Sequence, residues 1–297
     1  EGAFGYQLID VTVVSAQGPQ EVRMYLPPDD IPVGQGPWSL AHWQRNYEAV
    51  AVLAATELFA HVPALTHTQI ARNWHMIEHR AWAKYTAAHS PSPATVRSAP
   101  QPVEVVDKAP PQGTFFRIQA LHIKHQRFDG TVSAVLPRET FVGADAAIVL
   151  PYDANRDRIL LVEQLRMGPL VRQAPNPWLL EPVAGMIDAF ETPDQTALRE
   201  SREEAGLADI TLRHITSFYP SPGSSTDYFH CYLGLCDLPD DLPRFGGLES
   251  EAEDLRLHLL SFDDAMALVA SGEINVGPLV TLLYALGAQR DALRKPA

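Results

Sequence analysis

Short runs of apolar residues follow one another along the second half of the chain and predict strands interleaved with few helices. Near the C-terminus, apolar residues at helical spacing predict helices at about Phe262–Ala270 and Pro278–Leu293. The Asp-Gly pair in RFDG and the polar stretch YDANRD are turn signals between neighbouring strands. The expected strands are Phe115–His125, Val132–Phe141, Ala146–Leu150, Ile159–Gln164, Tyr228–Leu235 and Leu255–Leu260, with more strand around Phe218. This pattern predicts an α/β (α+β) fold in which a mixed β-sheet is covered by helices.

The first third of the chain has a pattern of its own. Tyr6–Val14 and Val22–Leu26 read as two strands. A helix is expected to begin after Ser39, which is a suitable N-cap, and a second helix covers roughly Thr68–Ala88. These elements predict a smaller α+β region ahead of the main sheet.

A proline-rich segment separates the two regions. Residues 86–111 hold six prolines, which predicts a linker that merges into an edge strand. We therefore place a boundary near Ser90–Ala99. The expected domains are an N-terminal one at residues 1–95 and a second one at residues 96–297.

A helix between the two halves of the expected sheet is predicted by its end signals. Thr192 is a suitable N-cap, Pro193 suits the first helical position and Gln195 completes a capping box. Gly206 is placed to end the helix in the left-handed conformation. The helix is therefore expected to cover about Pro193–Ala205.

Three glutamates gather on one side of this helix. Glu200, Glu203 and Glu204 are spaced i, i+3 and i+4, and Arg199 stands four residues before Glu203, where the two can form an ion pair. Carboxylates this close raise one another's pKa values. They are either a solvated charged face or ligands of a hard divalent cation such as Mg²⁺, and the spacing alone leaves both interpretations open.

Composition narrows the class of protein. The 297 residues are 46% apolar, which is typical of a globular protein with a core, and carry a net charge of −13. Such an acidic surface argues against nucleic acid or an anionic membrane as the main partner, and no apolar run is long enough to predict a membrane span. Cys231 and Cys236 are expected to be buried thiols on opposite faces of a strand, which favours a cytoplasmic location.

The motif around the acidic helix distinguishes the two interpretations of its glutamates. Its positions follow the pattern G-x5-E-x7-R-E-U-x-E-E-x-G-U, where U is a bulky apolar residue. They are Gly185, Glu191, Arg199, Glu200, Glu203, Glu204, Gly206 and Leu207. This pattern resembles the Nudix box, and Ser201 is its one departure. The resemblance implies an αβα sandwich and hydrolysis of a nucleoside diphosphate linked to another group, by attack of water on phosphorus.

The same resemblance implies a set of metal ligands. Glu200 and Glu204 would be the main catalytic carboxylates, with Glu203 nearby and the backbone carbonyl of Ala184 contributing. The implied cofactor is Mg²⁺, with Mn²⁺ as a possible substitute, because Nudix enzymes use a divalent ion to neutralise phosphate oxygens and to activate water.

A resemblance to one group of Nudix enzymes extends over about residues 102–293. The stretches that carry it are NPWLLEPVAGMIDAFE, SFYPSPGSSTDYF, GGLESEAEDLRLHLL and ALVASGEINVGPLV. Pro222 lies fifteen residues beyond Leu207, at a position where bacterial ADP-ribose pyrophosphatases have a proline close to the substrate. The implied reaction converts ADP-ribose and water to AMP and ribose 5-phosphate.

The acidic stretch Glu249–Asp254 has four acids in six residues. Taken alone, it reads as a solvated loop, because like charges rarely cluster in packed regions. In the similar enzymes this loop supplies the general base and another metal ligand. That resemblance assigns the base to Glu251 and the ligand to Glu253.

The substrate-binding residues also follow from the resemblance. Arg166 matches an arginine that holds the diphosphate and the nearby ribose, although an exposed arginine after a strand is often structural. Phe115 and Arg138 match residues that sandwich adenine, reached from the partner subunit, and Phe115 as a plain core residue is the alternative. The similar enzymes are dimers with exchanged N-terminal strands, so a strand-exchanged homodimer is expected.

The N-terminal segment resembles part of another family. EGAFGYQLIDVTVV, VRMYLPP and PWSLAHWQ are similar to the second half of a γ-glutamylcyclotransferase-like domain, which precedes the Nudix box in Nudix proteins associated with tellurite resistance. Glu1 falls near the acid/base position of active cyclotransferases, but no substrate-binding glycine loop precedes it, so we interpret the segment as a scaffold or a truncated domain. HMIEH, at His75–His79, has the spacing of a zinc peptidase helix, yet ordinary surface and boundary histidines explain it better.

Two alternatives to ADP-ribose hydrolysis remain at this point. The first is hydrolysis of another nucleoside diphosphate sugar or of a dinucleotide. The second is a non-catalytic sensor that binds ADP-ribose, which the intact Glu200, Glu203, Glu204 and Glu251 argue against, because a binder need not keep a metal site and a base.

Overall fold

The computed structural model describes residues 5–28, 37–61, 63–93, 95–97, 102–247 and 253–294. The chain forms two compact units that divide between Val142 and Gly143. The boundary expected near Ser90–Ala99 lies inside the first unit, because the strands that follow the linker contact the helices that precede it. The extent of the two sequence-defined domains stays a prediction.

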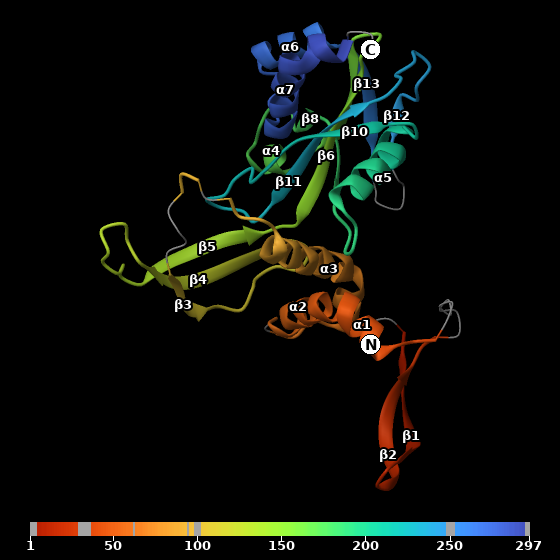
Figure 1. Cartoon of the computed structure of the whole chain (residues 1–297), viewed down its shortest axis with the longest axis vertical. Helices are drawn as coiled ribbons and strands as arrows, with labels where there is room; N and C mark the ends of the chain where they lie inside the picture. Colours follow the sequence, from red (N-terminus) through yellow and green to blue (C-terminus); the bar gives the residue numbers. More distant parts are fainter. Residues whose placement is uncertain are drawn as a thin grey trace. The chain divides into compact units, whose positions relative to one another are not determined.

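The second unit is built on a mixed sheet, eight-stranded in the part of the chain that the structure describes (Figure 1). The strands lie in the order β10-β11-β6-β7-β13-β12, with β8 paired to β7 and β9 paired to β6. Among the described strands of this sheet, β11 and β6 run parallel, and the other pairs are antiparallel. The bounds are β6 Asp145–Asp153, β7 Arg158–Leu165, β8 Trp178–Glu181, β9 Val183–Met186, β10 Thr211–Phe218, β11 Tyr228–Leu235, β12 Phe245–Gly246 and β13 Leu255–Ser261.

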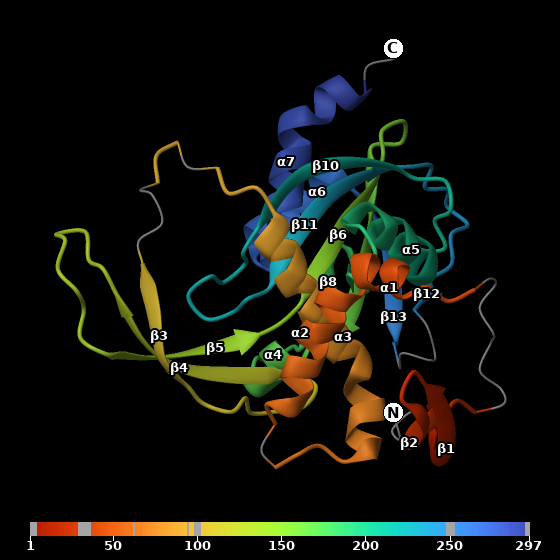
Figure 2. The same cartoon turned by 60° about the horizontal axis from the view of Figure 1, so that its bottom comes forward.

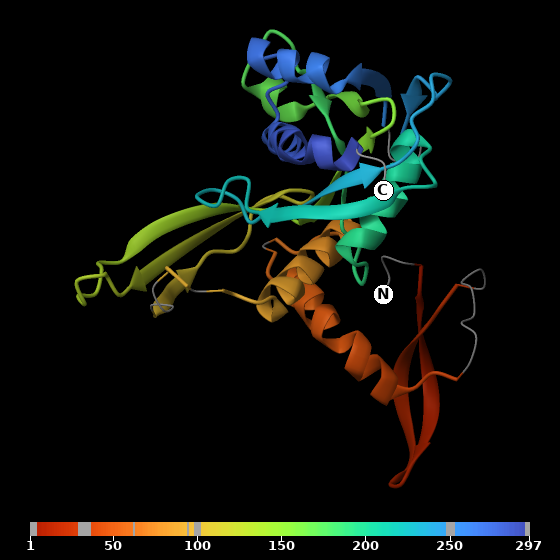
Figure 3. The same cartoon turned by 45° about the horizontal axis from the view of Figure 1, so that its top comes forward.

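Alternate residues of the strands bury two separate cores, one on each face of the sheet. On β6, Ile148 and Leu150 point toward α6 (Phe262–Ser271) and α7 (Gly277–Arg294), whereas Val149 points toward α5 (Pro193–Ala205). Figure 3 shows the blue helices α6 and α7 on one side of the strands and the green helix α5 on the other. The expected αβα sandwich with a mixed sheet is therefore confirmed.

Helix α5 begins and ends where its sequence predicts. Thr192 accepts a hydrogen bond from the Gln195 backbone, and the Gln195 side chain accepts one from the Thr192 backbone. Gly206 ends the helix with φ 68°. A short helix, α4 (Met167–Val171), follows β7 and was not expected.

The described residues of the first unit form two small sheets and three helices (Figure 2). Its elements are β1 Gln7–Ser15, β2 Gly18–Leu26, α1 Leu40–Asn46, α2 Glu48–Phe59, α3 His67–His89, β3 Val103–Lys108, β4 Arg117–His125 and β5 Leu136–Val142. Ser39 caps α1 as expected, but the helix breaks at Tyr47, where φ is −129°. Strand β5 starts at Leu136 rather than at the expected Val132. The Ser133 hydroxyl accepts a hydrogen bond from the His125 amide, and this contact interrupts the regular pairing between β4 and β5.

The structure also bears on the two cysteines and on the expectation of no membrane span. Cys231 and Cys236 are free thiols, Cys231 buried and Cys236 half-buried, so the expectation of unpaired cysteines is confirmed. Among the described helices, none combines the length and the apolar character needed to cross a membrane.

One carboxylate joins the sheet to the C-terminal helix. Asp157, in the turn between β6 and β7, accepts hydrogen bonds from Arg290 Nε at 2.9 Å, Arg294 Nη1 at 2.9 Å and the Tyr152 hydroxyl at 2.9 Å. Arg290 also lies 4.4 Å from the centroid of the Phe262 ring. The hydrogen bonds from Arg290 are the main cause that lowers the pKa of Asp157, so its charge stabilises the folded chain.

Asp157→Asn should lower the free energy of unfolding by about 1–3 kcal/mol at neutral pH, because asparagine tolerates the positive φ of this position but carries no charge. The lowered pKa means that the contribution is present above the ordinary pKa of aspartate and disappears as the pH falls through the lower folded value. Urea titrations at neutral and acidic pH measure the difference between the two proteins. Equal midpoints at neutral pH would contradict the role of Asp157.

Candidate active site on the acidic helix

Two of the three glutamates on α5 are buried rather than solvated. Glu204 is 2% exposed and Glu200 is 8% exposed, while Glu203 is half-buried. The helix therefore does not present a simple solvated face, which was one of the two interpretations of its spacing. Burying two carboxylates on one helix face is costly unless hydrogen bonds or cations compensate their charge.

Arg199 provides part of this compensation. Its Nη1 atom donates to Glu200 Oε1 at 2.7 Å and to Glu203 Oε2 at 3.0 Å, so the predicted pair with Glu203 is confirmed. Its Nε and Nη2 atoms donate to Glu191 at 3.2 and 3.1 Å, and Nη2 also donates to the Met186 carbonyl at 3.3 Å. One guanidinium thus ties the loop after β9 to the helix.

Glu191 is the second anchor of that loop. Its Oε2 atom accepts a hydrogen bond from the Thr196 hydroxyl at 2.6 Å in addition to those from Arg199. Burial acts to raise the pKa of Glu191, but the hydrogen bonds from Arg199 and Thr196 outweigh it and lower the pKa. Glu191 is therefore an ionised structural group in this arrangement.

Gly185 gives the Glu200 carboxylate its space. A Cβ atom on Gly185 would lie 1.8 Å from Glu200 Oε1 and 2.0 Å from Glu200 Cδ. The carboxylate therefore lies directly against the backbone of β9, where only a residue without a side chain leaves room. Gly246 of β12 instead leaves space for the backbone of α5, since its Cβ would lie 1.8 Å from the Glu204 carbonyl oxygen.

Glu204 is held from the same strand. The Ala184 amide donates to Glu204 Oε2 at 3.2 Å. Burial is the main cause that raises the pKa of Glu204 well above its ordinary value, and this hydrogen bond offsets it only in part. The charges of Glu200 and Glu253 raise the pKa further, whereas Arg166 lowers it.

The donor set of this region fits a hard divalent cation. Carboxylates and a backbone carbonyl are the oxygen ligands that Mg²⁺ and Mn²⁺ accept, and a cation would offset the repulsion between Glu200 and Glu204. Within the described ranges, no three acidic, histidine or cysteine side chains are already arranged to hold a metal ion. Arg199 instead occupies oxygen atoms of Glu200 and Glu203.

A buried glutamate that sequence reasoning missed orients Arg166. Arg166 follows β7, and its Nε atom donates to Glu181 Oε2 at 2.7 Å, while Gln164 donates to the same oxygen at 2.9 Å. Burial is the main cause that raises the pKa of Glu181, against the opposing effects of Arg166 and Gln164. The signal in the sequence is a lone acid within the apolar stretch NPWLLEPVAG. Glu181 fixes the direction of an arginine whose side chain is 43% exposed.

The other expected site residues are distributed over both units. Glu253 lies just before β13, close enough to Glu204 to affect its pKa, and Pro222 lies in an exposed turn between β10 and β11. Glu251 lies outside the described residues. Phe115 and Arg138 belong to the first unit, the former just before β4 and the latter within β5. The structure thus brings Glu200, Glu203, Glu204, Glu253, Ala184 and Arg166 to one region of the second unit.

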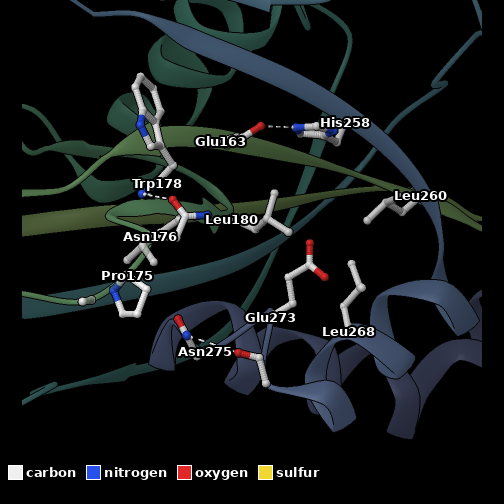
Figure 4. A pocket seen from close by; sticks show the side chains of 13 residues that line it. Glu163, Pro175, Asn176, Trp178, Leu180, His258, Leu260, Leu268, Glu273 and Asn275 are labelled. Atoms are coloured by element: carbon white, nitrogen blue, oxygen red, sulfur yellow. Dashed lines mark hydrogen bonds and ion pairs between the residues drawn. The ribbon is translucent and has the colours of Figure 1, made fainter. Parts of the chain in front are cut away.

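Two other features lie apart from this region. A cavity of about 520 Å³ lies on the α6 side of the sheet, lined by residues that include Trp178, Leu180, His258 and Glu273 (Figure 4). It contains none of the glutamates of α5, which pack on the opposite face.

In the HMIEH stretch, His75 and His79 stand edge to face with ring centroids 6.0 Å apart.

Gly185→Ala should weaken the binding of Mg²⁺ or Mn²⁺ by about 10- to 100-fold while the fold is retained. The added methyl displaces the end of a flexible side chain, Glu200, rather than backbone. Calorimetric titration with each ion measures the affinity, and thermal unfolding checks the fold. Gly277→Ala is the matched control, because no atom lies within 4 Å of its Cβ position. Unchanged affinity in Gly185→Ala would rule out Glu200 as a ligand held in this position.

The chain is similar to several known proteins. The family model of the NUDIX domain matches residues 143–280. ADP-ribose pyrophosphatase of Haemophilus influenzae is 34% identical over 179 residues, which are 60% of this chain and 82% of the relative. GDP-mannose pyrophosphatase of Yersinia enterocolitica is 29% identical over 155 residues, 52% of this chain and 80% of the relative. A solved ADP compounds hydrolase has a TM-score of 0.49 at 19% identity, covering 65% of this chain and 95% of that chain. The motif geometry and the relative at 34% identity together show that this chain belongs to the Nudix family of hydrolases.

Proposed function

We propose that this chain is a Mg²⁺-dependent hydrolase that converts ADP-ribose and water to AMP and ribose 5-phosphate. The observation that carries the proposal is the pair of buried carboxylates Glu200 and Glu204, packed against β9 in a chain 34% identical to an ADP-ribose pyrophosphatase. A protein that only needed charge on its surface would leave these groups in water. Their burial is useful where a cation and a diphosphate share the site.

The residues of α5 and its surroundings have proposed roles in holding the metal. Glu200 and Glu204 are the main ligands, and Glu203, Glu253 and the Ala184 carbonyl complete the set. When bound, Mg²⁺ neutralises phosphate oxygens and lowers the pKa of a bound water. Arg199 acts through Glu200, whose carboxylate it orients.

The remaining roles concern the substrate. Arg166 binds the diphosphate and the nearby ribose, because its guanidinium presents several donors and is oriented by Glu181. Glu251 orients the attacking water and takes its proton, as a general base must. Pro222 and its turn lie along the substrate.

A panel of nucleoside diphosphate derivatives with Mg²⁺ tests the proposal. ADP-ribose should be hydrolysed with the highest kcat/KM, giving AMP and ribose 5-phosphate by chromatography. The similarity to GDP-mannose pyrophosphatase makes GDP-mannose the first alternative substrate, with dinucleotides next. Preferred cleavage of one of these would replace ADP-ribose in the proposal, and binding of ADP-ribose without cleavage of any compound would support a sensor.

Glu204→Gln and Glu251→Gln should separate metal binding from base catalysis. Glutamine at position 204 keeps an acceptor for the Ala184 amide but loses the charge, so hydrolysis should fall by orders of magnitude and the metal titration should shift to higher Mg²⁺. Without metal, Glu204→Gln should unfold at a temperature equal to or above that of the wild type, because the repulsion with Glu200 is removed. Glu251→Gln should keep both binding steps and lower kcat by about 10²–10⁴-fold.

The comparison with Glu253→Gln decides between two neighbouring acids. This variant should shift the Mg²⁺ titration, as Glu204→Gln does, because Glu253 is the proposed ligand. Normal hydrolysis by Glu251→Gln together with an inactive Glu253→Gln whose metal binding is intact would show that the two roles are exchanged. Normal turnover by Glu204→Gln at saturating Mg²⁺ would refute the ligand assignment.

We also propose that the active form is a homodimer with exchanged N-terminal strands, in which Phe115 and Arg138 of different subunits sandwich adenine. The strand register supports this arrangement. Arg138 pairs with Leu121, which is four residues along β4 from Arg117. At about 3.3 Å per residue, Arg138 therefore lies about 13 Å along the strand from Arg117, and Phe115 comes just before Arg117, so the two residues of one chain are not neighbours on the sheet.

Mixed dimers test this geometry. Phe115→Ala and Arg138→Ala should each raise KM for ADP-ribose more than they lower kcat, because adenine is remote from the broken bond. When the two variants are co-expressed, about half of the dimers are mixed, and each mixed dimer has one intact sandwich, so about a quarter of the wild-type sites return. A monomeric mass of 32.7 kDa by light scattering, or no recovery in mixed dimers, would contradict the proposal.

The location and the N-terminal segment complete the proposal. A cytoplasmic location is supported by the two free thiols, and fractionation of cells tests it. The N-terminal helices and the β1–β2 hairpin are proposed to be a scaffold related to γ-glutamylcyclotransferase-like domains rather than a second active site; an assay for cyclotransferase activity tests this.

A further inference from the structure

A buried ion cluster joins the N-terminal helices to strand β4. Glu57 of α2 is buried, and its Oε1 atom lies 2.8 Å from Arg80 Nε of α3 and 2.5 Å from Arg117 Nη1 of β4. The side chains of Glu57, Arg80 and Arg117 are 1%, 0% and 6% exposed. Lys84 of α3 reaches Glu57 Oε2 at 3.3 Å from a half-exposed position. These contacts connect three elements through one carboxylate.

The cluster continues to Phe115, the residue proposed to stack on adenine. Arg80 Nη1 donates to the Phe115 carbonyl at 2.7 Å, so the same guanidinium that binds Glu57 also holds the backbone just before β4. The ring of His75, five residues before Arg80 on α3, lies edge-on to the Phe115 ring, with the ring centroids 5.9 Å apart. Phe115 remains 41% exposed, which leaves part of its ring accessible for stacking.

We infer that the helical pair α2–α3 positions Phe115 as a stacking platform for the base of the substrate, with Arg80 and His75 as positioning residues. The inference rests on the proposed function, since it assigns the N-terminal helices to that same substrate. A ring whose backbone and edge are already held loses little conformational freedom when a base stacks on it. The N-terminal segment then contributes to substrate affinity without contacting the reacting phosphates.

Steady-state kinetics with ADP-ribose test the inference. Arg80→Lys keeps a positive charge beside Glu57 but is too short to bind both Glu57 and the Phe115 carbonyl. It should raise KM at least about 5-fold, within the 5- to 150-fold range expected for loss of one base–aromatic stack, while kcat changes less than about 3-fold. His75→Ala, at an exposed position outside the ion cluster, should raise KM by a smaller factor without affecting folding.

Lys84→Met is the matched control for the ion cluster. Like Arg80→Lys, it changes a cation that contacts Glu57. Within the described residues, the hydrogen bond and ion pair of Lys84 go to Glu57 and not to β4. KM for ADP-ribose should therefore stay within about 2-fold of the wild type. The decisive measurement is a double-mutant cycle with Phe115→Ala. If Arg80 and His75 act through Phe115, neither substitution should raise KM further once the ring is absent.

The possible outcomes can be told apart. Additive KM effects in the Phe115→Ala background, or equal KM effects of Arg80→Lys and Lys84→Met, would overturn the inference. If Arg80→Lys does not fold, as judged by thermal unfolding, His75→Ala and its cycle with Phe115→Ala decide the question. If the wild type neither hydrolyses nor binds ADP-ribose, the proposed function fails; if the wild type hydrolyses it and these variants have normal KM values, only the inference fails.

Discussion

The arrangement of the candidate active site depends on the burial of two neighbouring carboxylates, Glu200 and Glu204, against strand β9. In the folded chain this burial is unfavourable in itself, because both carboxylates leave water and repel each other. The neighbouring groups are arranged around that constraint. Gly185 leaves space for one carboxylate, and the Ala184 amide donates to the other. A short strand and the helix that follows it are therefore matched to each other by electrostatics as much as by packing.

The contacts of Arg199 depend on the spacing of the residues in the motif. One planar guanidinium reaches Glu191 in the loop and both Glu200 and Glu203 on the helix, and it also reaches the Met186 carbonyl. Adding or removing one residue between Glu191 and the helix would move at least one of these partners out of hydrogen-bonding distance. Arg199 also reduces the repulsion among the carboxylates in the absence of metal. A cation bound to Glu200 would share that carboxylate with Arg199 or replace its hydrogen bond.

The features that depend on residues close together in the sequence could be predicted. The features that depend on contacts between distant residues could not. The limits of α5 followed from Thr192, Gln195 and Gly206, which interact only with residues near them in sequence. Strand β9 was not foreseen, because it is short, follows Pro182 and is defined by pairing with a distant strand. The partners of Arg199 beyond Glu203 were missed for the same reason. The role of Glu181 was also missed, since a lone acid in an apolar stretch does not reveal its partner.

In the N-terminal region, a buried ion cluster fixes the position of the start of β4 relative to α3. Buried ion pairs often add little net stability compared with apolar side chains of the same size, but their geometry is strict. Glu57 can accept from Arg80 and Arg117 together only if α3 and the start of β4 keep one register. The hydrogen bond from Arg80 to the Phe115 carbonyl then fixes a specific peptide group rather than a general surface. An aliphatic contact at this place would allow β4 to slide, whereas the charged one holds the Phe115 carbonyl, just before β4, in one position.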